Sequence, residues 1–120
     1  ALDSREVECF VFDQKGVWSY CAETNALKLL AEGDHRSATT AGQDFVHSAP
    51  VTLIFAVNQA KTERISGGRA GVMVQNALLA CSAMGLAAVP RAWFEPQTVL
   101  QALGLTSYDP QMAVTVGFPK

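Results

Sequence analysis

The stretch from residue 70 to residue 84 predicts a helix that is apolar in nearly every direction. Its apolar residues cover most of the helical wheel: Val72, Met73, Val74, Ala77, Leu78, Leu79, Ala80, Ala83 and Met84. A helix that is apolar all round has to be buried on all sides. One domain of 120 residues can hardly supply that cover. We therefore expect a partner subunit to pack against this helix.

Composition and charge narrow the class of protein. Apolar residues make up 49% of the chain and charged residues 17%, which suits a globular domain with additional buried surface. A formal net charge of −2 gives no general attraction to nucleic acid or to an anionic membrane. No apolar run approaches the roughly 18 residues of a membrane span, and no leader pattern is present. We expect a soluble, cytoplasmic protein without nucleic-acid or membrane partners.

The cysteines and histidines form no pattern typical of a metal site or a nucleophilic triad. Cys9, Cys21 and Cys81 lack ligand spacing, and we interpret them as small buried apolar residues in a reducing compartment. His35 lies in the sequence Asp-His-Arg (residues 34–36), which is typical of a solvated turn. His47 has no convincing Ser or Cys partner. The sequence therefore predicts no bound metal.

The first third of the chain predicts a β-hairpin followed by short helices. Residues 7–12 and 17–21 are rich in β-branched and aromatic residues, and the turn-forming sequence Asp-Gln-Lys-Gly separates them. Residues 25–31 have an apolar spacing that predicts one or two helical turns. A second short helix is expected to begin at Gly33 and Asp34, with Asp34 as its N-cap.

The remainder alternates strands with helices. The uninterrupted apolar run 51–57 predicts a central strand that is covered on both faces. The long helix 70–84 follows a polar loop and ends at Gly85. A short strand over 87–89, a helix over 96–103 with Pro at its first position, and a last strand over 113–116 complete the series. This order predicts an α+β fold with a mixed sheet.

Four stretches in order resemble the flavin-dependent nitroreductase superfamily. Residues 71–86 (GVMVQNALLACSAMGL) are similar to its central helix, in which a small residue precedes Gln-Asn, Leu-rich and Ala-rich turns, and Gly-Leu. Ala-Pro before the strand 51–57, LQALGL at 100–105 and VGFP at 116–119 match three further family motifs. The resemblance covers nearly the whole chain, and four motifs in register are more specific than any one of them.

The resemblance implies a particular fold and chemistry. The fold would be a mixed, mostly antiparallel sheet flanked by helices, forming a homodimer through the long buried helix with FMN at the subunit interface. The flavin would take a hydride from NAD(P)H and pass electrons to a nitroaromatic, quinone or related small-molecule acceptor. Such a protein binds and orients the flavin and excludes water, so no catalytic side chain is expected.

The resemblance also assigns six flavin-contact candidates. Asp3 and Arg5 occupy positions where the family usually has Asn-x-Gln against the flavin ring or ribityl chain. Lys120 ends the chain near the family's basic residue on the FMN phosphate. The other three are Arg91, Ala92 and Trp93 in the sequence Pro-Arg-Ala-Trp-Phe (90–94), where the family presents backbone amides to the flavin N5 edge.

Each of these assignments has a structural alternative. Trp93 and Phe94 could pack in a subunit interface, and Arg91 could be a surface cation. Gln75 and Asn76 are better explained as hydrogen-bonding groups between helices than as flavin contacts.

The family's Arg-x-Ser-x-Arg phosphate clamp has no match in this chain. We therefore expect residues 1–120 to be a single but incomplete domain, either the later two-thirds of a longer protein or a truncated paralogue. The alternative function is a non-catalytic dimeric domain that keeps the fold without binding flavin.

Overall fold

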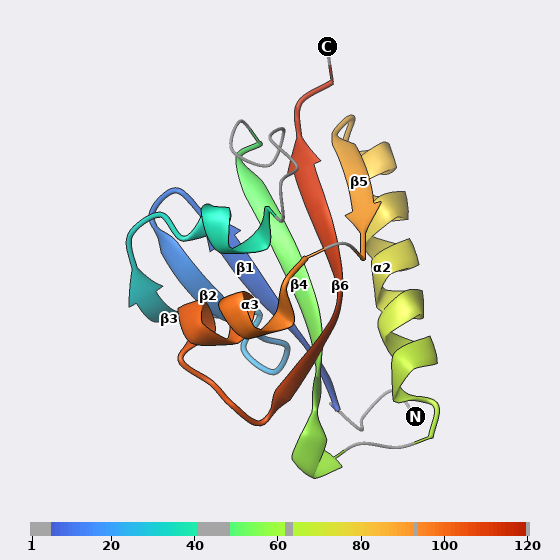
Figure 1. The fold of residues 1–120 in the computed structure, drawn as a ribbon. Helices are drawn as coiled ribbons and strands as arrows, with labels where there is room; N and C mark the ends of the chain where they lie inside the picture. Colours follow the sequence, from blue (N-terminus) through green and yellow to red (C-terminus); the bar gives the residue numbers. More distant parts are fainter. Residues whose placement is uncertain (1–5, 41–48, 62–63, 93, 120) are drawn as a thin grey trace.

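Within the described residues, one antiparallel sheet and two helices form the framework of the fold (Figure 1). The structure is a computed structural model that describes residues 6–40, 49–61, 64–92 and 94–119. The strands are β1 (Val7–Asp13), β2 (Gly16–Cys21), β3 (Ala26–Glu32), β4 (Val51–Asn58), β5 (Ala87–Arg91) and β6 (Tyr108–Gly117). The helices are α2 (Ser66–Ala83) and α3 (Pro96–Leu103), with short 3-10 turns η1 (Arg36–Thr39) and η2 (Gln59–Lys61).

The strand order is β3-β2-β1-β4-β6-β5. Every pairing between these strands is antiparallel. The predicted α+β class with a mostly antiparallel sheet is therefore confirmed. The apolar run 51–57 is the central strand β4, which pairs with β1 on one side and β6 on the other.

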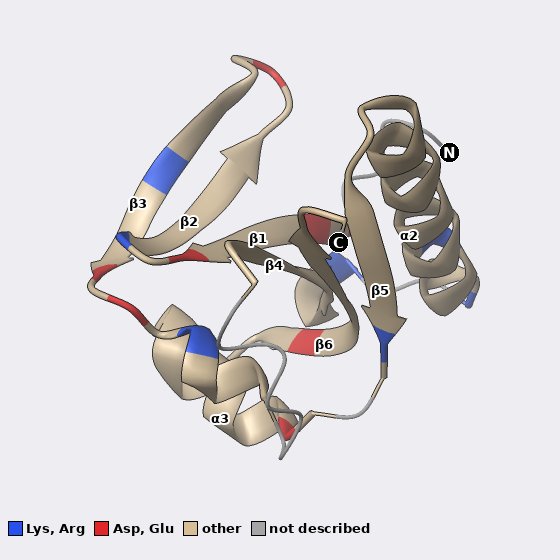
Figure 2. Cartoon of the chain, turned by 90° about the horizontal axis from the view of Figure 1, so that it is seen from above, with Lys and Arg blue, Asp and Glu red and all other residues tan. Residues whose placement is uncertain are grey.

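The two helices cover opposite faces of the sheet (Figure 2). Alternate residues of each strand point to opposite faces, so one strand supplies both cores. The core under α3 contains Phe10, Phe12, Val17, Ile54, Ala56, Val99, Leu103 and Ala113. The core under α2 contains Val7, Phe55, Val57, Ala70, Val74 and Val114. The register of β4 thus fixes where both helices pack.

The helix predicted over residues 25–31 is wrong, because this segment is strand β3. Leu27 pairs with Tyr20 of β2, and the Tyr20 hydroxyl donates to Asn25 Oδ1 at 2.8 Å. Asn25 has a positive φ of 49°, which Asn tolerates and which reverses the chain between the strands. Pairing with β2 therefore overrides the helix preference of Ala, Leu and Lys in this segment.

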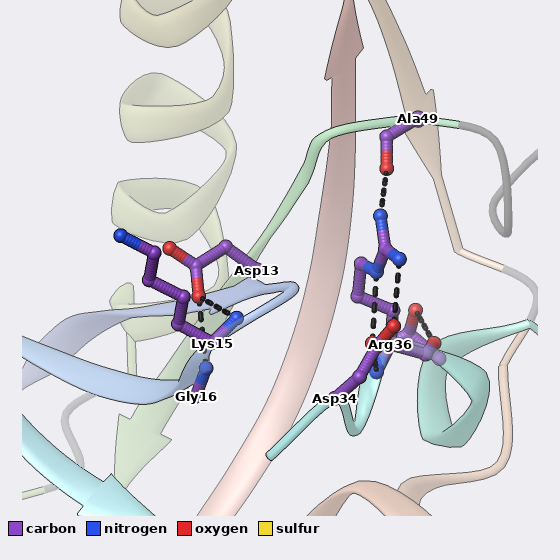
Figure 3. Close-up of polar contacts among 7 residues, drawn as sticks. Asp13, Lys15, Gly16, Asp34, Arg36 and Ala49 are labelled. Carbon is purple, nitrogen blue, oxygen red and sulfur yellow. Dashed lines mark hydrogen bonds and ion pairs between the residues drawn. The ribbon is translucent and has the colours of Figure 1, made fainter. Parts of the chain in front are cut away.

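The β1–β2 turn is held by one carboxylate. Asp13 Oδ1 accepts hydrogen bonds from the amides of Lys15 and Gly16, both at 2.9 Å, and from Trp18 Nε1 at 3.1 Å. Figure 3 shows the two amide contacts. Partial burial raises the pKa of Asp13, but these hydrogen bonds outweigh burial, so the pKa lies below its usual value. The predicted hairpin is confirmed.

We expect Gly16→Ala to lower the free energy of unfolding by about 1–3 kcal/mol, because overpacking a tight site costs that much. An added Cβ would lie 2.7 Å from the Ala31 carbonyl oxygen and 2.8 Å from Leu29 Cδ1. Gly68→Ala is the matched control. Its Cβ would meet nothing within 4 Å, and Ala is preferred to Gly in a helix, so stability should rise by about 0.5–1 kcal/mol. Urea denaturation measures the free energy of unfolding of each variant. Equal changes in Gly16→Ala and Gly68→Ala would contradict the steric argument.

Helix α2 begins one turn earlier than predicted, at Ser66 instead of residue 70. The two consecutive glycines at 67–68 lie inside its first turn and do not delay it. Its predicted end is confirmed: Gly85 adopts a left-handed φ of 75°, and the Leu86 amide donates to the Cys81 carbonyl oxygen at 2.8 Å.

Among the residues that the structure describes, those of α2 that are buried lie on one side of the helix. Ala70, Val74 and Cys81 face the sheet, while Val72 is 60% exposed and Leu79 59% exposed. This agrees with the expectation that one domain cannot cover the helix. Its cover by a second subunit stays a prediction.

Helix α3 has the predicted boundaries, residues 96–103. The Glu95 side chain accepts a hydrogen bond from the Gln97 amide at 3.4 Å, and Gly104 ends the helix with a φ of 70°. The second short helix expected after Gly33 is the single turn η1. Asp34 Oδ1 accepts from the Arg36 amide there at 3.1 Å.

Candidate functional site

Two of the six predicted flavin-contact residues lie in the described part of the chain. They are Arg91, the last residue of β5, and Ala92, which follows it. The other four, Asp3, Arg5, Trp93 and Lys120, lie outside the described residues. Arg91 is only 3% exposed, so the alternative that it is a surface cation is wrong. Ala92 is exposed at the point where β5 stops pairing with β6.

The Arg91 guanidinium lies in a buried polar cluster. Its Nη1 donates to Thr115 Oγ1 of β6 at 3.2 Å, and its Nη2 donates to the Thr39 carbonyl oxygen. The same Nη2 lies 3.4 Å from the Thr40 carbonyl oxygen. The Thr115 hydroxyl also shares a hydrogen bond of 3.1 Å with the Thr52 hydroxyl of β4. Burial lowers the pKa of Arg91, whose hydrogen bonds still satisfy the cation.

Arg91 contacts η1 at Thr39, its last residue. Arg36, the first residue of η1, holds the opposite end of this turn (Figure 3). Arg36 Nη2 forms an ion pair of 2.6 Å with Asp34 Oδ2, and its Nη1 donates to the Ala49 carbonyl oxygen at 2.8 Å. The hydrogen bond from Arg36 lowers the pKa of Asp34 to about 2. Asp34 is exposed, His35 is half-buried and the Arg36 side chain is 15% exposed, so the segment interpreted as a solvated turn is solvated only in part.

The end of β5 is exposed at Ala92. This residue has a small, apolar side chain. Phe94 is half-buried and packs against the core under α3, within this chain. Since Ala92 has no polar side chain, the donor that it could offer at this place is its backbone amide. The phosphate candidates Arg5 and Lys120 lie outside the described residues.

A buried ion pair that the sequence did not predict joins α2 to the start of β1. Glu6 is 0% exposed, and its Oε1 accepts from Arg69 Nη1. The Glu6 carbonyl oxygen also accepts from the Asn58 amide at 2.6 Å. The two charged residues are 63 positions apart, and neither belongs to a motif, so the sequence carries no signal for their contact.

The cysteines differ in environment. Cys81 is buried and Cys9 half-buried, and burial raises the pKa of the Cys9 thiol to about 12. The interpretation of Cys21 as a buried residue is wrong. It lies at the exposed end of β2, where the β2–β3 hairpin projects from the body of the sheet (Figure 2).

Tyr108 is a second residue whose pKa is shifted. Burial, followed by the hydrogen bond and the charge of Glu8, raises its pKa to about 12. Its ring packs edge-on against Phe10, with centroids 5.3 Å apart. Both perturbed groups, Cys9 and Tyr108, therefore stay protonated at neutral pH.

A surface hollow of about 370 Å³ lies beside the C-terminal end of α3, away from Arg91 and Ala92. It is lined by Gln97, Leu100, Gln101, Gly104, Leu105 and Thr106. Because it contains no charged side chain and no predicted contact residue, we do not take it as the functional site. Within the described ranges, no three His, Cys, Asp or Glu side chains are grouped to hold a metal ion. No helix there is long and apolar enough to cross a membrane.

Comparison with known proteins gives one consistent family. The family model described as the Nitroreductase family matches residues 1–118. A Methanocaldococcus jannaschii protein assigned as a nitroreductase, MJ1384, is 28% identical over 115 residues, which cover 87% of this chain and 58% of MJ1384. A solved Ralstonia eutropha protein assigned as a nitroreductase has a TM-score of 0.85 and 30% identity, over 96% of this chain and 59% of its own.

A third relative carries information on cofactors. The FMN-dependent nitroreductase NfnB of Mycobacterium smegmatis, solved in complex with NADPH, is 28% identical with a TM-score of 0.56. That match covers 63% of this chain and 34% of NfnB. The chain thus spans less than two-thirds of the length of each of these relatives.

Proposed function

The chain belongs to the nitroreductase family, and we propose on this basis that it acts in an FMN-dependent oxidoreductase. The protein would pass electrons from NAD(P)H to a nitroaromatic, quinone or related small acceptor. The observation that supports the proposal is the exposed position of Ala92 at the end of β5, next to the buried Arg91 cluster. The FMN and NADPH of the related NfnB support the choice of cofactors.

In this proposal the residues of the chain bind and orient the flavin. The amide of Ala92, with that of Trp93, would face the N5 edge of the ring. Asp3 and Arg5 would lie against the ring or ribityl chain, and Lys120 near the phosphate. When bound, FMN supplies hydride and electron transfer, which no side chain of the chain can perform.

We further propose that two copies of the protein pair through α2. The exposed side of this helix carries Val72 and Leu79, and Gln75 and Asn76 lie exposed beside them. An apolar stripe with flanking amide side chains suits a helix–helix interface in which the amides form hydrogen bonds. A homodimer would also bury the apolar surface that makes this helix unusual.

The test of the redox site is Ala92→Pro. Proline removes the backbone N–H and fixes φ, so a hydrogen bond to the flavin would be lost. Losing one such bond corresponds to about a tenfold fall in the rate of flavin reduction by NAD(P)H. Stopped-flow absorbance of the flavin measures this rate.

Ala92→Ser is the matched control, because it keeps the N–H at the same exposed position. It should reduce flavin at the wild-type rate. A proline variant that folds, binds FMN and is reduced as fast as wild type would show that the Ala92 amide does not contact the flavin.

The second candidate function is a dimeric domain that keeps the fold without flavin. It is favoured by the engagement of Arg36, Arg69 and Arg91 with groups of the protein itself, since a flavin phosphate is best held by arginines. A purified protein that is yellow, or that becomes yellow on titration with FMN, supports the oxidoreductase. A colourless protein that takes up no FMN supports this second function.

A further inference from the structure

We propose that Arg91 is a positioning residue, which fixes the backbone of Ala92 by fastening the end of β5 to β6 and to η1. The proposal rests on the proposed function for its effect on flavin, but the anchoring itself concerns this chain alone. It differs from a direct contact between Arg91 and the cofactor, because the guanidinium is directed into the protein.

The end of β5 needs such an anchor. Among the strands that the structure describes, β5 lies at the edge of the sheet and pairs with β6 alone, and the pair Arg91–Ala113 is the last in their register. Beyond that pair the described register between β5 and β6 ends, and strand ends held on one side open readily. A donor aimed at a reacting ring has to be held within a fraction of an ångström, so fraying at this point would weaken it.

The side chain of Arg91 supplies the missing constraint. In the β5–β6 register, Val89 lies opposite Thr115, so Arg91 Nη1 reaches back along β6 to the Thr115 hydroxyl at 3.2 Å. The Thr39 carbonyl oxygen, which accepts from Nη2, belongs to η1 and lies 52 positions earlier in the sequence. One planar guanidinium therefore links three segments that are distant in the sequence.

Only arginine among the side chains can make this link. Its rigid fork directs several N–H groups toward separate acceptors, whereas lysine provides a single point of donation. An aliphatic side chain would fill the space without holding η1. Thr39, Thr52 and Thr115 are each 4% exposed or less, so water competes little for these bonds.

The experiment compares Arg91→Met with Arg36→Met. Both replace a guanidinium with an unbranched apolar chain, and both remove a contact to the η1 region, but Arg36 donates to Asp34 and Ala49 instead of β6. Hydrogen exchange followed by mass spectrometry reports the peptide that contains residues 87–92. We expect Arg91→Met to speed exchange there about tenfold, which corresponds to about 1.4 kcal/mol of local opening, and Arg36→Met to leave it unchanged.

Flavin chemistry gives the second readout. For FMN-loaded protein we expect Arg91→Met to slow flavin reduction about tenfold at saturating NAD(P)H while the FMN dissociation constant changes less than about threefold. Arg91→Lys should recover part of the rate. Thr115→Val removes one hydrogen-bond acceptor of Arg91 and keeps the cation. It should slow flavin reduction less than Arg91→Met does.

The outcomes separate the two proposals. If the Arg91→Met variant folds and residues 87–92 exchange hydrogen as slowly as in the wild type, the anchoring is wrong. It is also wrong if Arg36→Met accelerates exchange in these residues as much as Arg91→Met does. If Arg91→Met does not fold, Thr115→Val decides by the same exchange measurement. A wild-type protein that takes up no FMN contradicts the proposed function, while the exchange experiment still decides the anchoring.

Discussion

Replacing Arg69 with methionine is expected to lower the free energy of unfolding by about 3–5 kcal/mol, which is the usual effect of breaking a buried ion pair from one side. The Glu6 side chain is only 1% exposed, while Arg69 is 22% exposed. Removing the guanidinium takes away the cation that pairs with the buried Glu6 carboxylate. Urea denaturation, with the m-value held in common, measures the change.

Asp34→Asn is the control for this prediction. It breaks the ion pair between Asp34 and Arg36, in which the Asp34 side chain is 42% exposed, and exposed pairs contribute about 0–1 kcal/mol. The double variant Glu6→Gln with Arg69→Met should regain part of the loss, because no buried charge remains. A loss of less than about 1 kcal/mol in Arg69→Met would show that Arg69 is not the main group that compensates the buried Glu6 carboxylate.

Leu79→Asp is expected to convert the proposed dimer into a folded monomer. Leu79 is 59% exposed and lies on the side of α2 that faces away from the sheet, so a charge there need not disturb the core. In the centre of an apolar interface the same charge should weaken dimer association by more than about 2.7 kcal/mol. The dissociation constant of the dimer would then rise by more than about a hundredfold. Sedimentation velocity at micromolar protein measures the change in mass, and circular dichroism checks the fold.

Gln101→Asp serves as the matched charge control, because Gln101 is an exposed residue of the other helix. It should leave the dimer intact. A wild-type protein that sediments as a monomer at these concentrations would contradict the proposed interface. So would a Leu79→Asp variant that remains a dimer.

The sequence predicted elements well where the local pattern agrees with the final packing. The apolar run of β4 and the capped helix α3 are examples, and the boundaries of α3 were predicted to the residue. The prediction failed at β3, because Leu27, Leu30 and Ala31 fit a helical spacing as well as a strand. Only the pairing of β3 with β2, a tertiary contact, decides between them.

For the candidate site, the structure gives the place of two of the named residues in the fold, and their contact with flavin stays a prediction. The resemblance directed attention to Arg91 and Ala92, and the structure places both at the end of β5. It did not predict that the Arg91 side chain is buried, because its acceptors Thr39 and Thr115 come from segments with no motif. The same holds for the ion pair between Glu6 and Arg69. Contacts between isolated polar residues leave no periodic trace in a sequence.

The strand order has a consequence for the kinetics of folding. β1, β2 and β3 are consecutive neighbours joined by turns of a few residues, so this meander closes small loops and should form early. β4 pairs with β6, and Val51 lies opposite Val116, so this pairing has to wait for α2, β5 and α3 between them. Such separation in sequence slows folding, because loop entropy is lost before the contacts form. The central strand of the finished sheet is therefore the boundary between an early half and a late half of folding.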